Sequence, residues 1–272
     1  MFDANNVKMQ LVQWIKDFFY KGASPETKAV LGISGGKDSS VVAALCKEAL
    51  GKDRVLGVLM PLGNQHDIDI AYEICKTLDI PYVEINIKIP AQALYDEVEK
   101  AGFQMNDVAV FNTPARLRMA VLYAVSGIVG GRVANTSNLS EAWVGYSSKF
   151  GDAAGDFGPL LNLTVTEVKD IGRELGLAPI FVDKVPIDGL CGKTDEDNLG
   201  FTYAVLDKYI RENICDDKQV KEKIDKMHKV NLHKQRPMPT FRPGVAFTEP
   251  SSWLCLTSNS ASRPVDNEAD VV

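Results

Sequence analysis

Residues 29–40 read Ala-Val-Leu-Gly-Ile-Ser-Gly-Gly-Lys-Asp-Ser-Ser, and this stretch decides the fold. Ala29–Ile33 is an apolar run of strand length, and a glycine-rich loop follows it at once. The apolar spacing of Ser39–Leu50 then predicts a helix that ends before Gly51. A strand, a glycine-rich loop and a helix in this order are typical of a parallel α/β sheet, in which ligands bind at the carboxyl ends of strands.

The same alternation of strands and helices extends on both sides of this stretch. Strands are predicted at Val55–Leu59, Tyr82–Ile87 and Arg132–Asn135, and helices at Val7–Tyr20, Asp67–Leu78, Pro90–Ala101 and Pro114–Val129. Strands that read as apolar runs between helices indicate a sheet covered on both faces. We therefore predict an α/β fold: a doubly wound, Rossmann-like parallel sheet flanked by helices.

The sequence after the last predicted strand has a different character. Thr136–Leu161 is rich in Ser, Gly, Asp and aromatic residues and fits no regular period, whereas Thr164–Leu175 again predicts a helix. Val185–Asn198 is a loop long enough to be a mobile active-site segment. Two C-terminal helices are predicted, at Gly200–Glu212 and Asp217–Leu232. We expect one domain over residues 1–250 and a polar tail over residues 251–272.

Composition narrows the classes of protein. A formal charge of -6 and a pI near 5.2 argue against a nucleic-acid binder, which would show a basic face. The five cysteines are scattered and odd in number, so a disulfide framework is not expected. No apolar run is long enough to span a membrane, and no signal peptide is visible at the N-terminus. We expect a cytoplasmic enzyme.

The loop Ser34–Ser40 has the residues of a phosphate site. Glycines Gly35 and Gly36 allow a close approach of the backbone to an anion, and the helix that follows adds its dipole. Hydroxyl groups and one positive charge are supplied by Ser34, Ser39, Ser40 and Lys37. The loop is not a Walker A motif. Asp38 would repel phosphate unless a cation lay between them, which predicts Mg²⁺. The alternative is a tight turn in which Asp38 only favours the helix N-terminus.

This loop resembles the signature S-G-G-x-D-S of the N-type ATP pyrophosphatases. The resemblance implies that ATP is cleaved between its α- and β-phosphates and that AMP is transferred to a substrate oxygen. The group includes NAD, GMP, asparagine and argininosuccinate synthetases and tRNA-modifying enzymes, and the loop alone does not choose among them.

Four further motifs resemble those of the ammonia-dependent NAD synthetases, in the same order and up to about Phe241. They are Asn112-Thr-Pro-Ala-Arg116, Asn135-Thr-Ser-Asn-Leu-Ser-Glu141, Lys149-Phe-Gly-Asp152 with Gly155-Asp156, and His233-Lys234-Gln-Arg-Pro237. The implied reaction converts deamido-NAD, ATP and ammonia into NAD, AMP and pyrophosphate through an adenylated nicotinate carboxylate. Mg²⁺ is the implied cofactor, and ATP is a co-substrate.

The resemblance also implies roles for individual residues. Asp38 and Glu141 match the Mg²⁺ ligands, Asp152 the aspartate near the ammonia site, and Lys193 lies in the family's mobile catalytic loop. ATP contacts are implied for Gln65 and Thr136 as well as the phosphate loop, and deamido-NAD contacts for Arg116, Lys149, Asp156, His233 and Lys234. Two alternatives stay open. Tyr123 borders the pyridine ring or is a core aromatic residue, and Asp152 serves ammonia or only a Gly-Asp turn.

The sequence also departs from this family's pattern. Three ATP contacts, an Arg, a Lys and a Thr, are replaced by Leu59, Val165 and Ile187. Lys37, Lys193 and Thr194 are candidate replacements. The phosphate loop begins at residue 34, which leaves no room before it for an amidase domain. The expected donor is therefore free ammonia, unless a separate amidase subunit supplies it.

The family also implies a homodimer with the dinucleotide site at its interface. The alternatives to this interpretation are another adenylating enzyme, such as a GMP synthetase ATPase subunit, and a nucleotide-binding module without catalysis. A tRNA substrate is disfavoured by the acidic charge.

Overall fold

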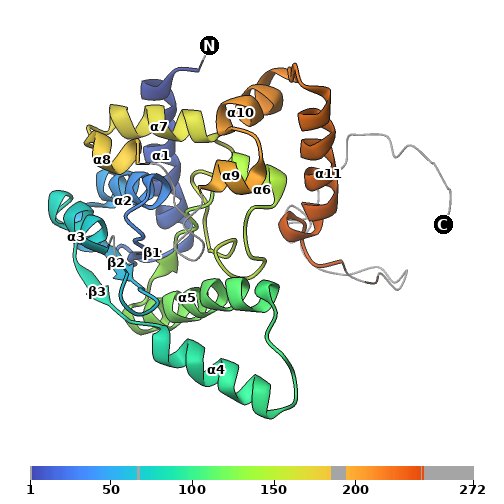
Figure 1. Cartoon of the computed structure of the whole chain (residues 1–272). Coiled ribbons are helices and arrows are strands. Elements are labelled where there is room, and N and C mark those ends of the chain that lie inside the picture. The colour runs from blue at the N-terminus through green and yellow to red at the C-terminus, as the bar shows by residue number, and fades with distance from the viewer. Residues whose placement is uncertain (1, 66–67, 185–193, 240, 242–272) are drawn as a thin grey trace. The chain divides into compact units, whose positions relative to one another are not determined.

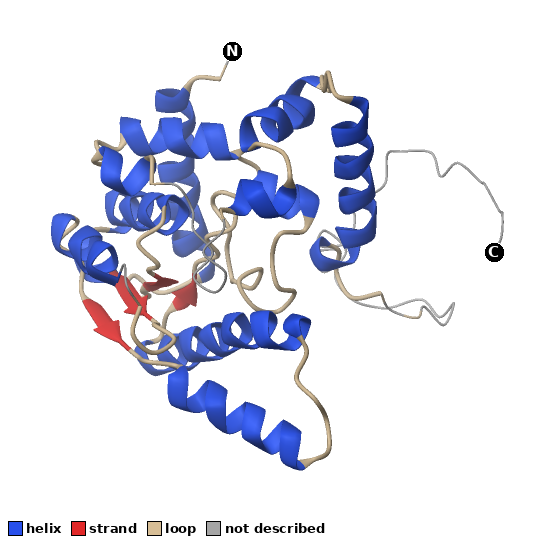
Figure 2. Ribbon diagram, in the orientation of Figure 1, coloured by secondary structure: helices blue, strands red, loops and turns tan. Residues whose placement is uncertain are grey.

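A parallel sheet lies at the centre of the molecule's first compact unit, Met1–Arg236. The structure is a computed structural model that describes residues 2–65, 68–184, 194–239 and 241. Within these residues the strands are β1 (Ala29–Gly32), β2 (Val55–Leu59), β3 (Tyr82–Glu84) and β4 (Arg132–Val133), in the order β3-β2-β1-β4 (Figure 2). Ala29 lies opposite both Val55 and Arg132. The predicted parallel sheet is confirmed, although β3 and β4 are shorter than expected.

Helices cover both faces of this sheet. Alternate residues of β1 point to opposite faces, so that Leu31 packs among the residues of one core and Val30 among those of another. The first core includes side chains of α1 (Ala4–Gly22), α2 (Lys37–Leu50) and α3 (Ile68–Thr77). The second lies against α5 (Asp107–Val129). In Figure 1, α1 and α2 lie above the sheet and α5 below it. The doubly wound arrangement is therefore confirmed.

The remaining helices have these bounds: η1 (Lys52–Arg54), α4 (Lys88–Lys100), α6 (Leu139–Val144), α7 (Val165–Glu174), α8 (Pro179–Val182), α9 (Asp195–Leu199), α10 (Tyr203–Glu212) and α11 (Lys218–Gln235). Helices α6, α9, α10 and α11 share a third core, which contains Val144, Leu199, Leu206 and Ile224. This core holds α6, which carries Glu141, beside α9 (Figure 1).

The prediction that a helix begins at Pro114 is wrong, because α5 begins seven residues earlier, at Asp107. Asn106 caps its N-terminus by accepting a hydrogen bond from the backbone N–H of Ala109 at 2.9 Å. Pro114 has no N–H to donate to the carbonyl of Val110, four residues earlier. The hydroxyl of Tyr95, on α4, donates to that carbonyl instead at 3.2 Å. The neighbouring helix thus allows the proline within α5.

Short helices were not predicted. Helix α6 lies within the segment Thr136–Leu161 that showed no period, and α9 overlaps the end of the predicted loop Val185–Asn198. Each has a side-chain cap, from Asn138 and Thr194 respectively, but each is too short to show a helical period. Helix α8 was missed for the same reason.

The domain boundary stays a prediction. Beyond Met1–Arg236 the chain forms a second unit, Pro237–Val272, of which the structure describes only residues 237–239 and 241. The tail at 251–272 lies outside the described residues. In the part of the chain that the structure covers, no helix has both the length and the apolar character needed to cross a membrane.

Candidate functional site

The predicted phosphate loop connects β1 to α2 and has the conformation that an anion site needs. Gly35 has a φ of +76°, and a Cβ atom there would lie 3.0 Å from the backbone nitrogen of Ala71. Only glycine fits this position, because the conformation is left-handed and the space is closed. Gly36 is the N-cap of α2, so the loop ends at the positive end of the helix dipole.

Hydroxyl groups hold the loop in this conformation. The Oγ of Ser34 accepts from the backbone N–H of Gly36 at 3.2 Å and contacts the Oγ of Ser39 at 3.1 Å. Ser39 and Ser40 both donate to the carbonyl of Gly36, at 3.1 and 2.8 Å. These hydroxyls were predicted as donors to phosphate. In the structure they stabilise the first turn of α2 and the loop itself.

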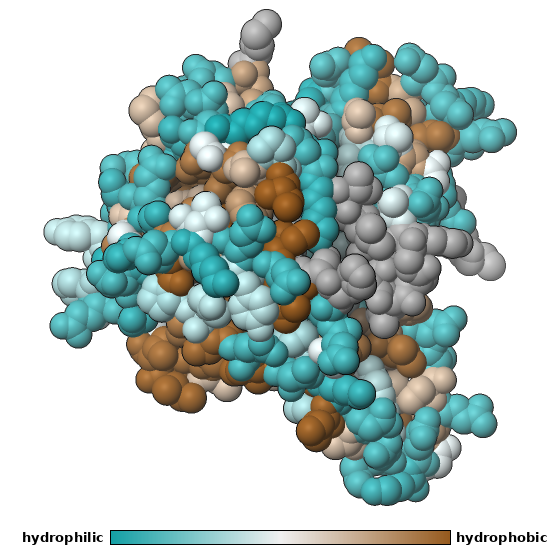
Figure 3. Space-filling view, turned by 60° about the vertical axis from the view of Figure 1, so that its left-hand side comes forward, coloured by the Kyte–Doolittle hydropathy of each residue, from teal (hydrophilic) through white to brown (hydrophobic). Residues whose placement is uncertain are grey.

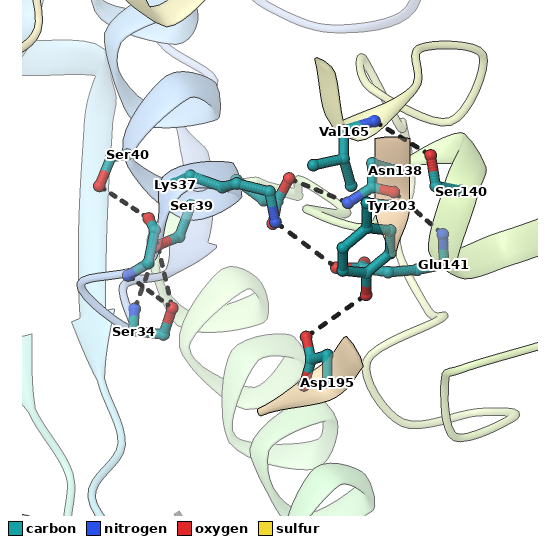
Figure 4. A network of polar contacts seen from close by, with 12 residues as sticks. Ser34, Lys37, Ser39, Ser40, Asn138, Ser140, Glu141, Val165, Asp195 and Tyr203 are labelled. Atoms are coloured by element: carbon teal, nitrogen blue, oxygen red, sulfur yellow. Dashed lines mark hydrogen bonds and ion pairs between the residues drawn. The ribbon is translucent and has the colours of Figure 1, made fainter. Parts of the chain in front are cut away.

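The two carboxylates assigned to a metal lie together. Asp38, in the first turn of α2, accepts from the side-chain amide of Asn138 at 3.1 Å, and Asn138 accepts from the backbone N–H of Glu141 at 3.0 Å (Figure 4). The ammonium of Lys37 lies 2.8 Å from Asp38 Oδ2 and 3.9 Å from Glu141 Oε1. Asn138 therefore links two helices that are far apart in the sequence and fixes the carboxylates on either side of one cation.

The electrostatics of this cluster are those of charges withdrawn from water. Burial raises the pKa of Glu141, the nearby Asp38 raises it further, and Lys37 opposes both. Burial by itself would lower the pKa of Lys37, but Asp38 and Glu141 outweigh it, so that pKa is raised and the ammonium stays charged. The ring of Tyr203 covers Lys37, with its centroid 5.7 Å from Nζ, and the Tyr203 hydroxyl donates to Asp195 at 3.4 Å.

These residues fit Mg²⁺ by the chemistry of their donor atoms. Mg²⁺ in phosphate-transfer sites takes one or two carboxylates and completes its shell with phosphate oxygens and water. Asp38 and Glu141 supply such a pair, and the cation between them shows that their position favours positive charge. A cluster of three or more His, Cys, Asp or Glu residues, as a closed metal site would need, does not occur among the described residues.

A second group of predicted residues surrounds the end of α11. Lys149 donates to the carbonyl of His233 at 2.7 Å, and the Nε of Arg116 donates to the carbonyl of Lys149 at 3.3 Å. Lys234 donates to the carbonyls of Gly145 and Ser147, at 2.7 and 2.9 Å. Four residues predicted to contact deamido-NAD, from α5, α11 and the loop between α6 and α7, are thus brought together. Three of them, Arg116, Lys149 and Lys234, carry positive charge.

Tyr123 and Asp156 line a cavity of about 390 Å³ together with Arg132. The Tyr123 hydroxyl donates to Asp156 Oδ1 at 3.4 Å, and the backbone N–H of Val133 donates to Oδ2 at 2.7 Å. The Tyr123 side chain is 37% exposed. Of the two readings of Tyr123, the position at a cavity wall fits the structure and the core position does not.

Asp152 lies in a turn, as one of its two interpretations required. Its Oδ1 accepts from the backbone N–H of Ser148 at 2.7 Å. Burial raises the pKa of Asp152, while the hydrogen bond from Ser148 and then the charge of Lys234 act against this. The turn does not exclude the role near ammonia, which stays a prediction.

The remaining predicted residues are placed by their burial alone or lie outside the described residues. Lys193 and Ile187 lie outside the described residues. Thr136 is half-buried just after β4, and Gln65 is half-buried near the start of α3. Leu59 and Val165, which replace charged residues of the family, are core residues with 0% and 4% exposure. They therefore belong to the packing of the domain.

The site also contains residues that the sequence interpretation missed. Asn138 is fully buried and connects the two carboxylates, and Tyr203 covers the cation between them. The pattern Asn138-x-x-Glu141 is that of a helix N-terminus, so it held a signal for the cap of α6. No comparable signal exists for Tyr203, which is brought to the site by the packing of α10.

Comparisons with known proteins show which family this chain resembles in sequence and fold. A sequence model described as NAD synthase matches residues 7–241. A protein of Pyrococcus furiosus named NH(3)-dependent NAD(+) synthetase is 37% identical over 244 residues, which cover 85% of this chain and 91% of that protein. A solved NMN synthetase from Francisella tularensis is similar with a TM-score of 0.81 and 31% identity, over 90% of this chain and all of that one. An NH3-dependent NAD synthetase from Campylobacter jejuni has a TM-score of 0.71 and 27% identity, over 89% of this chain and all of that one.

Proposed function

Because the chain belongs to the NAD synthase family, we propose that it is an ATP-dependent ligase that forms NAD from deamido-NAD and ammonia. The observation that carries this proposal is the pair of carboxylates, Asp38 and Glu141, held on either side of one cation beside a phosphate loop. A module without catalysis would have no need to bury two carboxylates there.

The reaction needs activation before ammonia can attack. A carboxylate is unreactive toward ammonia at neutral pH, and transfer of AMP to the nicotinate carboxylate supplies a leaving group. The chain contributes chiefly positioning and electrostatics. The N–H groups at the start of α2 bind the pyrophosphate portion of ATP, and Asn138 keeps Asp38 directed toward Glu141. Mg²⁺, held by Asp38 and Glu141, neutralises phosphate charge when bound.

Binding of the dinucleotide is assigned to two groups of residues: those around the end of α11, and those at the cavity lined by Tyr123 and Asp156. Arg116, Lys149 and Lys234 suit phosphate and carboxylate groups, and their closeness around the end of α11 supports this assignment. Asp156 suits ribose hydroxyls beside Tyr123, and the cavity that the two residues line supports that position. Asp152 is assigned to the ammonia end, where a carboxylate attracts ammonium and takes its proton.

A second candidate substrate is the mononucleotide of nicotinate. One observation favours it: the Francisella tularensis protein, whose TM-score of 0.81 exceeds the 0.71 of the Campylobacter jejuni enzyme, is called an NMN synthetase. Both substrates carry the same nicotinate carboxylate, so the adenylation chemistry is shared. They differ in the AMP portion, which only the dinucleotide has.

A homodimer is proposed on the basis of the exposed apolar side chains of the α4–α5 region. Ile89, Phe103, Val108 and Ile128 are 68–84% exposed. Figure 3 shows one face of the molecule, on which brown apolar areas interrupt the hydrophilic surface. Exposed apolar surface of this kind is typical of an interface. Light scattering after gel filtration tests the dimer, and Phe103→Glu with Val108→Glu should shift it to the monomer. The cytoplasm, where ATP and its nucleotide partners occur, is the proposed compartment.

The test of the proposed function is a comparison of substrates. Pyrophosphate release and product formation are measured with ATP and Mg²⁺, with ammonium or glutamine, and with deamido-NAD, nicotinate mononucleotide or xanthosine monophosphate. We expect ammonium and deamido-NAD to support the reaction, and Asp38→Asn or Glu141→Gln to lower kcat/KM at least ~100-fold. Asp96→Asn, an exposed residue of α4, is the control. A preference for the mononucleotide selects the second candidate, and a requirement for xanthosine monophosphate refutes both.

A further inference from the structure

Lys37 has an unusual position for a lysine. Its side chain is only 3% exposed, and its ammonium lies between the carboxylates of Asp38 and Glu141, at 2.8 and 3.9 Å (Figure 4). The ring of Tyr203 closes a further side at 5.7 Å. Lysine side chains are seldom buried unless they are paired with an opposite charge. The carboxylates of Asp38 and Glu141 therefore stabilise the buried ammonium of Lys37. The position it occupies is the one that a divalent cation would need.

The ammonium and a divalent cation cannot both be held there. Both would approach the same two carboxylates, and like charges a few ångström apart repel strongly where water is largely displaced. Without any cation, however, Asp38 and Glu141 would be two like charges in a half-buried site, which is also unfavourable. A cation at this point removes that repulsion, and in the structure Lys37 is that cation.

Lys37 is the variable residue x of the signature S-G-G-x-D-S. Lys37 is in the first turn of α2, next to the N–H groups assigned to the pyrophosphate of ATP. A lysine side chain has four methylene groups and turns freely about them, so its ammonium can exchange one set of oxygens for another nearby. ATP brings both a divalent cation and phosphate oxygens to this place.

We infer that Lys37 is an internal counter-cation that excludes divalent metal from the nucleotide-free site and gives up Asp38 and Glu141 only when ATP arrives with the metal. Its ammonium then moves to phosphate oxygens. The inference rests on the proposed function, since it takes Asp38 and Glu141 as metal ligands. Its consequence is an order of binding: metal enters with the nucleotide and not before it.

The experiment measures the binding of Mn²⁺ alone, as the probe for the metal, through the loss of the free-ion EPR signal. Lys37→Met removes the charge and keeps the length of the side chain. We expect the nucleotide-free Lys37→Met protein to bind Mn²⁺ at least tenfold more tightly than the wild type, and Glu141→Gln added to it should cancel the gain. Lys221→Met, which removes an equal charge on α11 where Lys221 pairs with Asp225, should bind Mn²⁺ like the wild type.

Thermal melting gives a second measurement. Lys37→Met should melt at a lower temperature than the wild type in EDTA and recover on addition of Mn²⁺, whereas the wild type should change little. Equal Mn²⁺ affinities of the wild type and Lys37→Met would overturn the inference. Should Lys37→Met not fold, Lys37→Gln takes its place. Tight Mn²⁺ binding by the nucleotide-free wild type overturns the inference without any variant.

A further measurement distinguishes failure of the proposed function from failure of the inference about Lys37. If the wild type with a non-hydrolysable ATP analogue holds no more Mn²⁺ than the analogue does by itself, then Asp38 and Glu141 are not metal ligands. In that case the metal role in the proposed function fails, whatever Lys37→Met does.

Discussion

Replacement of Asp207 by alanine should destabilise the protein by about 2–4 kcal/mol. Asp207 lies on α10 with 6% exposure and joins this helix to α6 and α7. Its Oδ1 accepts from the Ser140 hydroxyl at 2.5 Å, and its Oδ2 accepts from the backbone N–H and the hydroxyl of Thr166 at 2.8 and 2.7 Å. Ser140 in turn accepts from the backbone N–H of Val165 at 3.0 Å (Figure 4).

The magnitude follows from which donors lose their partner. A hydrogen bond to a charged acceptor contributes about 1.5–3 kcal/mol, and the fully buried Ser140 hydroxyl has no water to replace Asp207. Thr166 is exposed, so its two donors can bind water and their loss costs less. Three hydrogen bonds at full strength would therefore overestimate the loss of unfolding free energy. We expect Asp207→Ala to lower that free energy by about 2–4 kcal/mol.

Urea unfolding followed by circular dichroism measures this change. Asp225→Ala is the matched control, because Asp225 also accepts from two side chains, Tyr209 at 2.5 Å and Lys221 at 2.7 Å, but at the surface of α11. Such exposed contacts are worth less than about 1 kcal/mol. The reasoning is refuted if Asp207→Ala loses no more stability than Asp225→Ala.

Three further predictions concern backbone and thiol positions. Gly145→Ala should lower the free energy of unfolding by about 2–4 kcal/mol, because Gly145 has a φ of +69° and a Cβ there would lie 2.1 Å from the Cβ of Asn231. Urea unfolding measures this change, and a loss below about 1 kcal/mol contradicts the prediction. Gly127→Ala, in α5 with no atom within 4 Å of the added Cβ, should instead gain up to about 1 kcal/mol in the same assay, and a clear loss there contradicts the helix-propensity argument. Burial raises the pKa of Cys46 to about 12, so that at about pH 8 only about one thiol in ten thousand is ionised. Iodoacetamide should therefore modify the partly exposed Cys215 and spare Cys46 until the pH nears that pKa or the chain unfolds; peptide mass spectrometry measures this, and equal modification of both contradicts it.

The sequence was sufficient for the elements whose causes are local. The strand Ala29–Gly32 and the helix after it were predicted because an apolar run, two glycines and a helical period are adjacent in the chain. The two C-terminal helices, α10 and α11, were also predicted from the sequence alone. For the site, the resemblance assigned Asp38 and Glu141 to one metal. The structure brings both carboxylates to Lys37, and their role as metal ligands stays a prediction.

Elements that depend on a partner could not be predicted in this way. The start of α5 was missed because the carbonyl orphaned by Pro114 is bonded by Tyr95, a residue of another helix. The helix α6 is only six residues long, so its position depends on the cap at Asn138 and on packing against α11.

The charged groups and the sheet that carries the phosphate loop could be identified from the sequence, because periodicity and short motifs are properties of neighbouring residues. The way in which those charges are balanced depends on the three-dimensional packing. Asn138 meets Asp38 and Tyr203 covers Lys37 through contacts between helices that are distant in the chain. The burial of Lys37 between Asp38 and Glu141 also depends on this packing. The order of charged residues along the chain does not show which of them will be buried together. The electrostatic energy of a charge depends on that burial, because it removes water from around the charge.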